Sequence, residues 1–222
     1  MHIGKRCTRE MINLVLLLVQ VADTLQFLNQ DCNLVHRALC PDAIMLVGGA
    51  FKLALMGFSV MSEFSTESTV SSAFQYSAAD TELQRLLKPP LRYVAPELIA
   101  GTQTSAGLSS AADTYSFAAM AYEVLARQPL MAPRSTPAEV AGRLAGLALM
   151  PFPKIDLQLL PVLRSMLSPT VLQRQSVGTF VGSPYFQVCP AAERWNAALH
   201  PVQRSGCLSC IISHCAWVTS QS

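Results

Sequence analysis

The sequence carries little charge for its length. Asp, Glu, Lys and Arg make up 14% of the 222 residues, and 16 basic against 14 acidic side chains leave a formal net charge of +2. A field this weak implies neither a nucleic acid nor an anionic membrane as a partner, so we expect no nucleic-acid binding. Hydrophobic residues make up 51% of the chain, which argues against disorder and predicts a globular domain with a substantial core.

A long uninterrupted apolar run is also lacking. Residues 11–21 come closest to one, and basic residues such as Lys5 precede them, as in a signal peptide. The apolar period nevertheless continues past Asp23, as it does in one amphipathic helix, and Gln20 and Asp23 interrupt any membrane span. We therefore expect a helix over residues 10–28 and no transmembrane segment, with a signal peptide as the alternative.

The seven cysteines lack the density of a small secreted disulfide scaffold, and their number is odd. We therefore expect reduced thiols in the cytosol. One cluster near the C-terminus offers soft ligands at a spacing that zinc could use, but a second well-spaced pair is lacking. For residues 187–222 we expect a disordered tail in preference to a metal site. The weak zinc candidate consists of Cys207, Cys210, His214 and Cys215.

Periodicity and turn residues predict a mainly helical chain with one small β-hairpin. Two short apolar runs, residues 43–47 and 51–55, are joined by Gly48-Gly49, and two glycines supply the positive φ angles that a tight hairpin requires. Residues 59–81 are rich in Ser, Thr and Ala and predict a long, mobile surface loop. Further helices are predicted over residues 110–125, 136–148, 157–167 and 176–180, and Thr136-Pro137-Ala138-Glu139 is a capping box.

Four motifs follow one another in the chain. They are Leu-Val-His-Arg-Ala-Leu-Cys-Pro at residues 34–41, Lys-Leu-Ala-Leu-Met-Gly-Phe at 52–58, Tyr-Val-Ala-Pro-Glu at 93–97 and Asp-Thr-Tyr-Ser-Phe at 113–117. Each is weak alone, but their order, spacing and context together resemble the C-terminal lobe of a protein kinase.

The resemblance implies a fold and a division of the chain. It covers about residues 10–186, with residues 59–90 as a long activation-segment loop, and leaves residues 1–9 as an N-terminal extension. Since nine residues precede the first expected helix, we expect the N-lobe of the kinase fold to be absent. The expected fold is therefore mainly α, a kinase-like C-terminal lobe with a small β-hairpin.

The resemblance also assigns roles that concern shape. His36 would pack under the metal-binding turn, and Asp113 would accept hydrogen bonds from the backbone of the catalytic loop. Glu97 would pair with Arg174, and breaking a buried pair of this kind typically costs about 3–5 kcal/mol. The structural positions implied in this way are His36, Arg37, Gly57, Glu97, Asp113 and Arg174.

The positions that carry chemistry in a kinase hold other residues here. A kinase uses an Asp to accept the substrate proton, and an Asn and a second Asp to hold magnesium. The resemblance places Ala38, Ala43 and Leu55 there, with Cys40 in place of the loop lysine. None of these side chains can accept the substrate proton, and none offers the oxygen ligands that magnesium takes. We therefore expect no catalytic residue, no bound metal and no cofactor. Met45 matches the position under the adenine, but a plain core methionine is the simpler interpretation.

Within the kinase-like proteins the sequence is similar to the Scy-like pseudokinases. The similarity lies in His-Arg-x-Leu-Cys-Pro, Lys-Leu-Ala-x-x-Gly-Phe-Ser and the Pro-Pro-Leu-Arg-Tyr-Val-Ala-Pro-Glu-Leu-Ile stretch, and it is greatest to the coated-vesicle-associated branch. This resemblance implies a non-catalytic scaffold in the cytoplasm, peripheral to Golgi or endosomal membranes. Vesicle coat or adaptor proteins are the implied partners.

Three alternatives stay open from the sequence. One is a residual ATP-binding phosphotransferase, for which Asp42 is the available carboxylate in the loop. Another is a non-functional truncated fragment of a longer pseudokinase. A third concerns regulation, because phosphorylation within residues 59–81 could place a phosphate near Arg37, although abundant Ser is also typical of a solvated loop.

Overall fold

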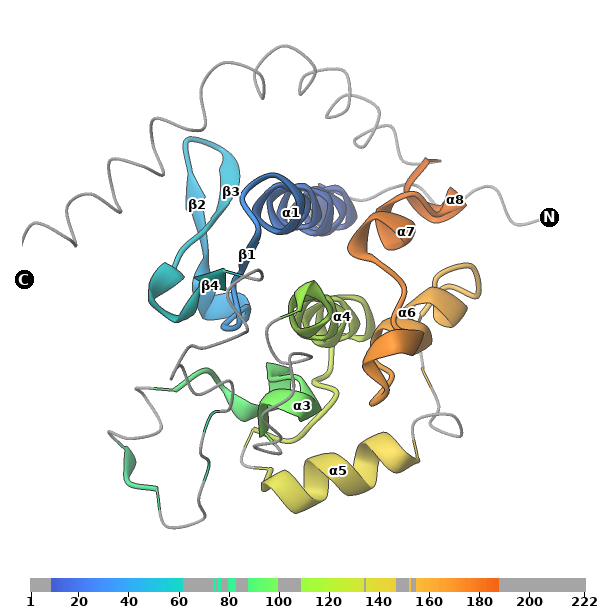
Figure 1. The fold of residues 1–222 in the computed structure, drawn as a ribbon. Helices are drawn as coiled ribbons and strands as arrows, with labels where there is room; N and C mark the ends of the chain where they lie inside the picture. The colour runs from blue at the N-terminus through green and yellow to red at the C-terminus, as the bar shows by residue number, and fades with distance from the viewer. Residues whose placement is uncertain are drawn as a thin grey trace, which may run out of the picture.

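The computed structural model describes residues 9–61, 74, 76, 80–82, 88–99, 109–133, 135–146, 152 and 155–187. These residues are mostly helical, with two short antiparallel strand pairs (Figure 1). The α-helices are α1 (Arg9–Gln26), α3 (Pro96–Ile99), α4 (Ser110–Ala126), α5 (Pro137–Ala145), α6 (Leu160–Met166), α7 (Val177–Val181) and α8 (Pro184–Gln187). The strands are β1 (Leu34–Val35), β2 (Ile44–Val47), β3 (Ala50–Leu53) and β4 (Val60–Met61).

Shorter helical turns connect these elements. A π-helical turn, η1 (Phe27–Asp31), continues α1, and 3-10 turns occur at η2 (Pro41–Ala43), η3 (Met56–Phe58), η4 (Leu91–Tyr93) and η7 (Val171–Gln173). Residues 1–8 and 188–222 lie outside the described residues, and so does the weak zinc candidate in the tail. No helix among the described residues combines the length and the apolar character needed to cross a bilayer.

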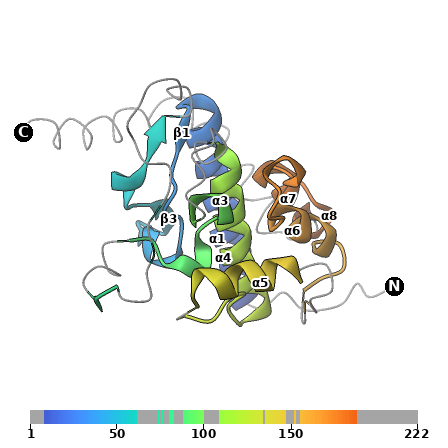
Figure 2. The same cartoon turned by 60° about the horizontal axis from the view of Figure 1, so that its bottom comes forward.

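Helices α1 and α4 lie side by side and form the centre of the core (Figures 1 and 2). Leu18, Ala22 and Leu25 of α1 are fully buried, and their spacing places them on one helix face. In α4 every residue from 112 to 122 is buried, as expected of a helix enclosed on all sides. The hairpin flanks this pair on one side and α6 to α8 on the other, where the Phe117 and Phe180 rings meet edge to face at 5.4 Å.

The predicted hairpin is confirmed. Strand β2 pairs with β3 in antiparallel register, and its turn residues Gly48 and Gly49 have φ angles of 59° and 81°, which suit glycine. The backbone N–H of Phe51 donates to Oε1 of Gln20 at 2.6 Å, which fixes the hairpin to α1. Gln20 is thus a buried bridging group within the apolar face of α1.

The predicted helices are confirmed, with shifts at two ends. Helix α5 opens with the expected capping box but ends at Ala145, three residues early, because Gly146 follows and glycine is a poor helix former. Helix α6 begins at Leu160 rather than residue 157, because Asp156 holds a preceding turn. Its carboxylate accepts from Gln158 N at 2.9 Å, and its carbonyl accepts from Leu160 N at 3.1 Å.

Candidate functional site

Asp113 holds the loop that follows β1. Its carboxylate lies in the first turn of α4 and is fully buried. Oδ1 accepts from Arg37 N at 2.8 Å, and Oδ2 accepts from His36 N at 2.8 Å and from Nδ2 of Asn29 at 3.0 Å. Burial raises the pKa of the Asp113 carboxyl, and these hydrogen bonds oppose that shift. The carboxylate therefore fixes the backbone of residues 36 and 37, with Arg37 in the left-handed region at φ 66°.

His36 joins this loop to the turn after the hairpin. Its Nε2 lies 2.8 Å from the carbonyl oxygen of Ala54, and its Nδ1 lies 3.3 Å from the backbone N of Ala38. A carbonyl only accepts and an N–H only donates, so Nε2 carries the proton and Nδ1 is the acceptor. The next residue, Leu55, has a φ of 58°, a strained value for a leucine. The frame expected around His36 and Asp113 is therefore present in the structure.

The side chains at the implied chemical positions divide into two groups. Ala38, Cys40 and Ala43 are buried, and burial raises the pKa of the Cys40 thiol, which keeps it neutral. Leu55 and Met45 are each 51% exposed, so Met45 is not the core methionine that the simpler interpretation expected. Across the described ranges, no three His, Cys, Asp or Glu side chains are grouped closely enough to hold a metal.

Asp42 and Gly57 also lie near this site. The Asp42 side chain is exposed in η2, as expected of a solvated residue. Gly57 is exposed too, and a β-carbon added there would meet no atom within 4 Å. The structure therefore shows no steric need for glycine at position 57.

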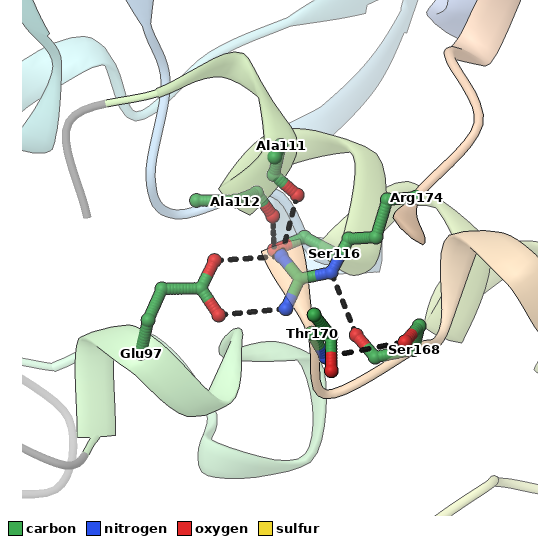
Figure 3. Close-up of polar contacts among 7 residues, drawn as sticks. All are labelled: Glu97, Ala111, Ala112, Ser116, Ser168, Thr170 and Arg174. Atoms are coloured by element: carbon green, nitrogen blue, oxygen red, sulfur yellow. Dashed lines mark hydrogen bonds and ion pairs between the residues drawn. The ribbon is translucent and has the colours of Figure 1, made fainter. Parts of the chain in front are cut away.

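Arg174 and Glu97 form a buried, bidentate ion pair. Nη1 and Nη2 of Arg174 donate to the two carboxylate oxygens of Glu97 at 2.6 and 2.7 Å. Nη1 also donates to Ala111 O and Nε to Ser168 O, both at 2.8 Å. Figure 3 shows the guanidinium between the α3 carboxylate and the first turn of α4. The pair expected from the motifs is therefore present, and it joins α3, α4 and the segment before α7.

Arg37 packs against a described residue of the segment expected to be a mobile loop. Its side chain is buried, and its guanidinium carbon lies 4.9 Å from the centre of the Phe74 ring. Burial lowers the pKa of Arg37, while the Asp113 charge acts in the opposite direction. Phe74 N donates to Leu98 O at 2.8 Å, and the Tyr76 hydroxyl donates to Pro89 O at 2.7 Å. These described parts of residues 59–90 are therefore anchored to the core, and most of residues 62–87 lie outside the described residues.

Sequence reasoning missed Asn29 as a site residue. It belongs to a polar stretch that predicts only the end of a helix. In the structure its amide donates to Leu34 O at 2.7 Å as well as to Asp113, so it ties η1, which continues α1, to the loop. A polar residue immediately after an apolar helix was the available signal, but the partner lies 84 positions away.

Comparison with known proteins identifies the family. The family model described as protein tyrosine and serine/threonine kinase matches residues 5–181, well over half of the chain. SCY1-like protein 2 from Mus musculus is 33% identical over 108 residues, which are 48% of this chain and 11% of that protein. The chain thus spans about a tenth of this relative, whose similarity agrees with the Scy-like resemblance of the motifs. The match over residues 5–181 shows that the chain belongs to the protein tyrosine and serine/threonine kinase family.

Proposed function

We propose that this chain is a pseudokinase domain, a kinase-like domain that does not transfer phosphate and serves as a scaffold for other proteins. One observation carries the proposal. Asp113 and His36 hold the catalytic loop in a defined conformation, while Ala38, Ala43 and Leu55 at the implied chemical positions bear no oxygen or nitrogen in their side chains.

The proposed loss of activity follows from what phosphoryl transfer requires. A general base must lie within hydrogen-bond reach of the substrate hydroxyl, about 2.6–3.2 Å, and the Ala38 methyl group cannot accept a proton. Magnesium bridges the nucleotide phosphates and binds to oxygen, which neither Ala43 nor Leu55 supplies. The Cys40 thiol is buried and neutral, so it provides no positive charge to stabilise the transferred group.

The scaffold role is proposed from the Scy-like resemblance together with the surface. The motifs resemble those of a kinase C-terminal lobe, and β2 exposes Met45, Leu46 and Val47. Exposed apolar side chains of this kind favour association with proteins. We propose vesicle coat or adaptor proteins as partners, in the cytoplasm and peripheral to Golgi or endosomal membranes.

Nucleotide binding tests the inactive-site proposal. The melting temperature of the purified chain is measured with and without magnesium and ATP, because a ligand that binds only the folded state raises it. We expect no shift for the natural chain. The triple variant Ala38→Asp, Ala43→Asn, Leu55→Asp is the matched control, since it returns oxygen ligands to the same frame. A magnesium-dependent rise in the melting temperature of the natural chain would contradict the proposed loss of magnesium ligands at positions 43 and 55.

Partner binding tests the scaffold separately. The immobilised chain is incubated with purified clathrin coat and adaptor proteins, and retention is compared with Leu46→Asp, which places a charge in the exposed apolar surface of β2. We expect retention by the natural chain and loss in the variant. Retention no higher than on empty resin would contradict the scaffold role and leave the inactive-site result unaffected.

A further inference from the structure

The chain contains three sites where a hydroxyl side chain precedes proline, and the structure separates them. They are Thr136-Pro137, Ser168-Pro169 and Ser183-Pro184. Proline-directed protein kinases require this dipeptide and reach only hydroxyls that solvent reaches. Ser168 and Ser183 are buried, with 8% and 6% of their surface exposed, whereas Thr136 is exposed.

The two serines are also built into local structure. The Ser168 hydroxyl donates to Gln173 Oε1 at 3.0 Å and accepts from Thr170 N at 3.1 Å, and its carbonyl accepts from Arg174. Ser183 lies against the core beside α7 and α8. Presenting either serine to another enzyme would require local unfolding around α6 to α8.

Thr136 differs in position and in backbone. It precedes the first residue of α5, with φ −83° and ψ 161°, the extended conformation favoured before proline. The turn before it is held by a hydrogen bond from Ser135 N to Ala132 O at 3.1 Å. The core contacts of α5 are made further along the helix by Val140 and Leu144, so opening this turn leaves them in place.

From this difference we infer that Thr136 is a phosphorylation site for a proline-directed serine/threonine protein kinase, a property that goes beyond the scaffold role. The partner kinase supplies ATP and a general base. The bond from the γ-phosphorus to its bridging oxygen breaks, a bond from that phosphorus to Oγ1 of Thr136 forms, ADP leaves, and the hydroxyl proton passes to the base of the partner kinase.

The modification changes the start of α5. Thr136 Oγ1 now accepts from Glu139 N at 3.3 Å, and Oε2 of Glu139 accepts from Thr136 N at 2.7 Å. A phosphate brings a charge of about −1.5 to −2, which suits the N–H groups of a helix start but repels the Glu139 carboxylate. Phosphorylation therefore replaces the capping box with a phosphate cap and releases Glu139.

Mass spectrometry of the purified full chain tests the site. The chain is incubated with a purified proline-directed serine/threonine kinase, magnesium and ATP, and the phosphorylated peptides are mapped. We expect phosphate at Thr136 and none at Ser168 or Ser183. Thr136→Ser should retain the modification, and Thr136→Asn should abolish it while keeping a good helix-capping side chain.

A synthetic peptide of residues 130–143 gives the reference rate for the sequence without the fold. We expect the folded chain to be phosphorylated at a rate comparable to the peptide. Phosphate on a buried serine in preference to Thr136 would overturn the inference, and so would a peptide that is modified while the folded chain is not, or failure to modify either one.

Glu139→Gln tests the exchange of caps. In the phosphorylated chain this variant should raise the melting temperature, because it removes the repulsion between the phosphate on Thr136 and the Glu139 carboxylate. In the unmodified chain it should not, because glutamine preserves the capping box. The same change of melting temperature in both states would overturn the proposed exchange.

Discussion

Replacing Arg174 with alanine should destabilise the domain strongly. The arginine side chain is fully buried and makes four hydrogen bonds, two to Glu97 and one each to Ala111 O and Ser168 O. Removing it leaves the Glu97 carboxylate buried without its partner, and breaking such a pair typically costs about 3–5 kcal/mol. That is a large share of the roughly 5–15 kcal/mol by which domains are stable.

The assay is urea unfolding followed by circular dichroism. With a slope of about 2 kcal/mol per molar, a loss of about 4 kcal/mol lowers the unfolding midpoint by about 2 M. Arg174→Lys keeps the charge but not the planar fork, so it should fall between the natural chain and Arg174→Ala.

Arg143→Ala is the matched control for this experiment. Arg143 is exposed, and its Nε donates to Leu130 O at 3.0 Å, so its removal should cost about 1 kcal/mol or less. If Arg174→Ala cost no more than Arg143→Ala, the reasoning that this ion pair joins α3, α4 and the segment before α7 would be refuted.

Three further predictions concern the core. Asp113→Asn should lower the free energy of unfolding by about 2–3 kcal/mol in the same assay. The charge-assisted hydrogen bonds of the carboxylate are lost, and the new amide N–H group would face N–H donors. An unchanged free energy of unfolding would count against the role of Asp113 in holding the loop after β1. Tyr115→Phe should be neutral or stabilising by up to about 1 kcal/mol, because the Tyr115 hydroxyl is buried with no hydrogen-bond partner among the described residues; clear destabilisation would show a missed partner. Cys40 should resist iodoacetamide in the folded chain at pH 8, as its thiol is buried with a raised pKa, whereas the partly exposed Cys32 should react, and peptide mapping that finds equal labelling would contradict this.

Local signals in the sequence predict much of the fold. The Gly48-Gly49 doublet specifies the hairpin because few other residues adopt positive φ at both positions, and the capping box specifies the start of α5. The pairing of β1 with β4 could not be predicted, since strands of two residues leave no periodic pattern. The start of α6 also depends on a local turn at Asp156 that periodicity does not reveal.

The site depends on contacts between distant segments. The Glu97 and Arg174 pair spans 77 positions and was predicted from the family resemblance alone, because neither residue is distinctive in its own segment. In the sequence, Gln20 is only a polar interruption of an apolar helix. The fold shows that its amide oxygen accepts a hydrogen bond from Phe51 N of the hairpin. Such roles depend on which elements become neighbours, which local propensity does not determine.

A phosphotransfer assay with radiolabelled ATP tests directly whether this domain transfers phosphate. The purified chain is incubated with magnesium, ATP labelled at the γ-phosphate and a general protein substrate, beside an active protein kinase as the positive control. We expect no label on the substrate or on the chain itself, because Ala38, Ala43 and Leu55 supply neither a base nor a metal ligand. Label that is transferred by the chain and lost in Asp42→Ala would contradict the proposal that this domain does not transfer phosphate.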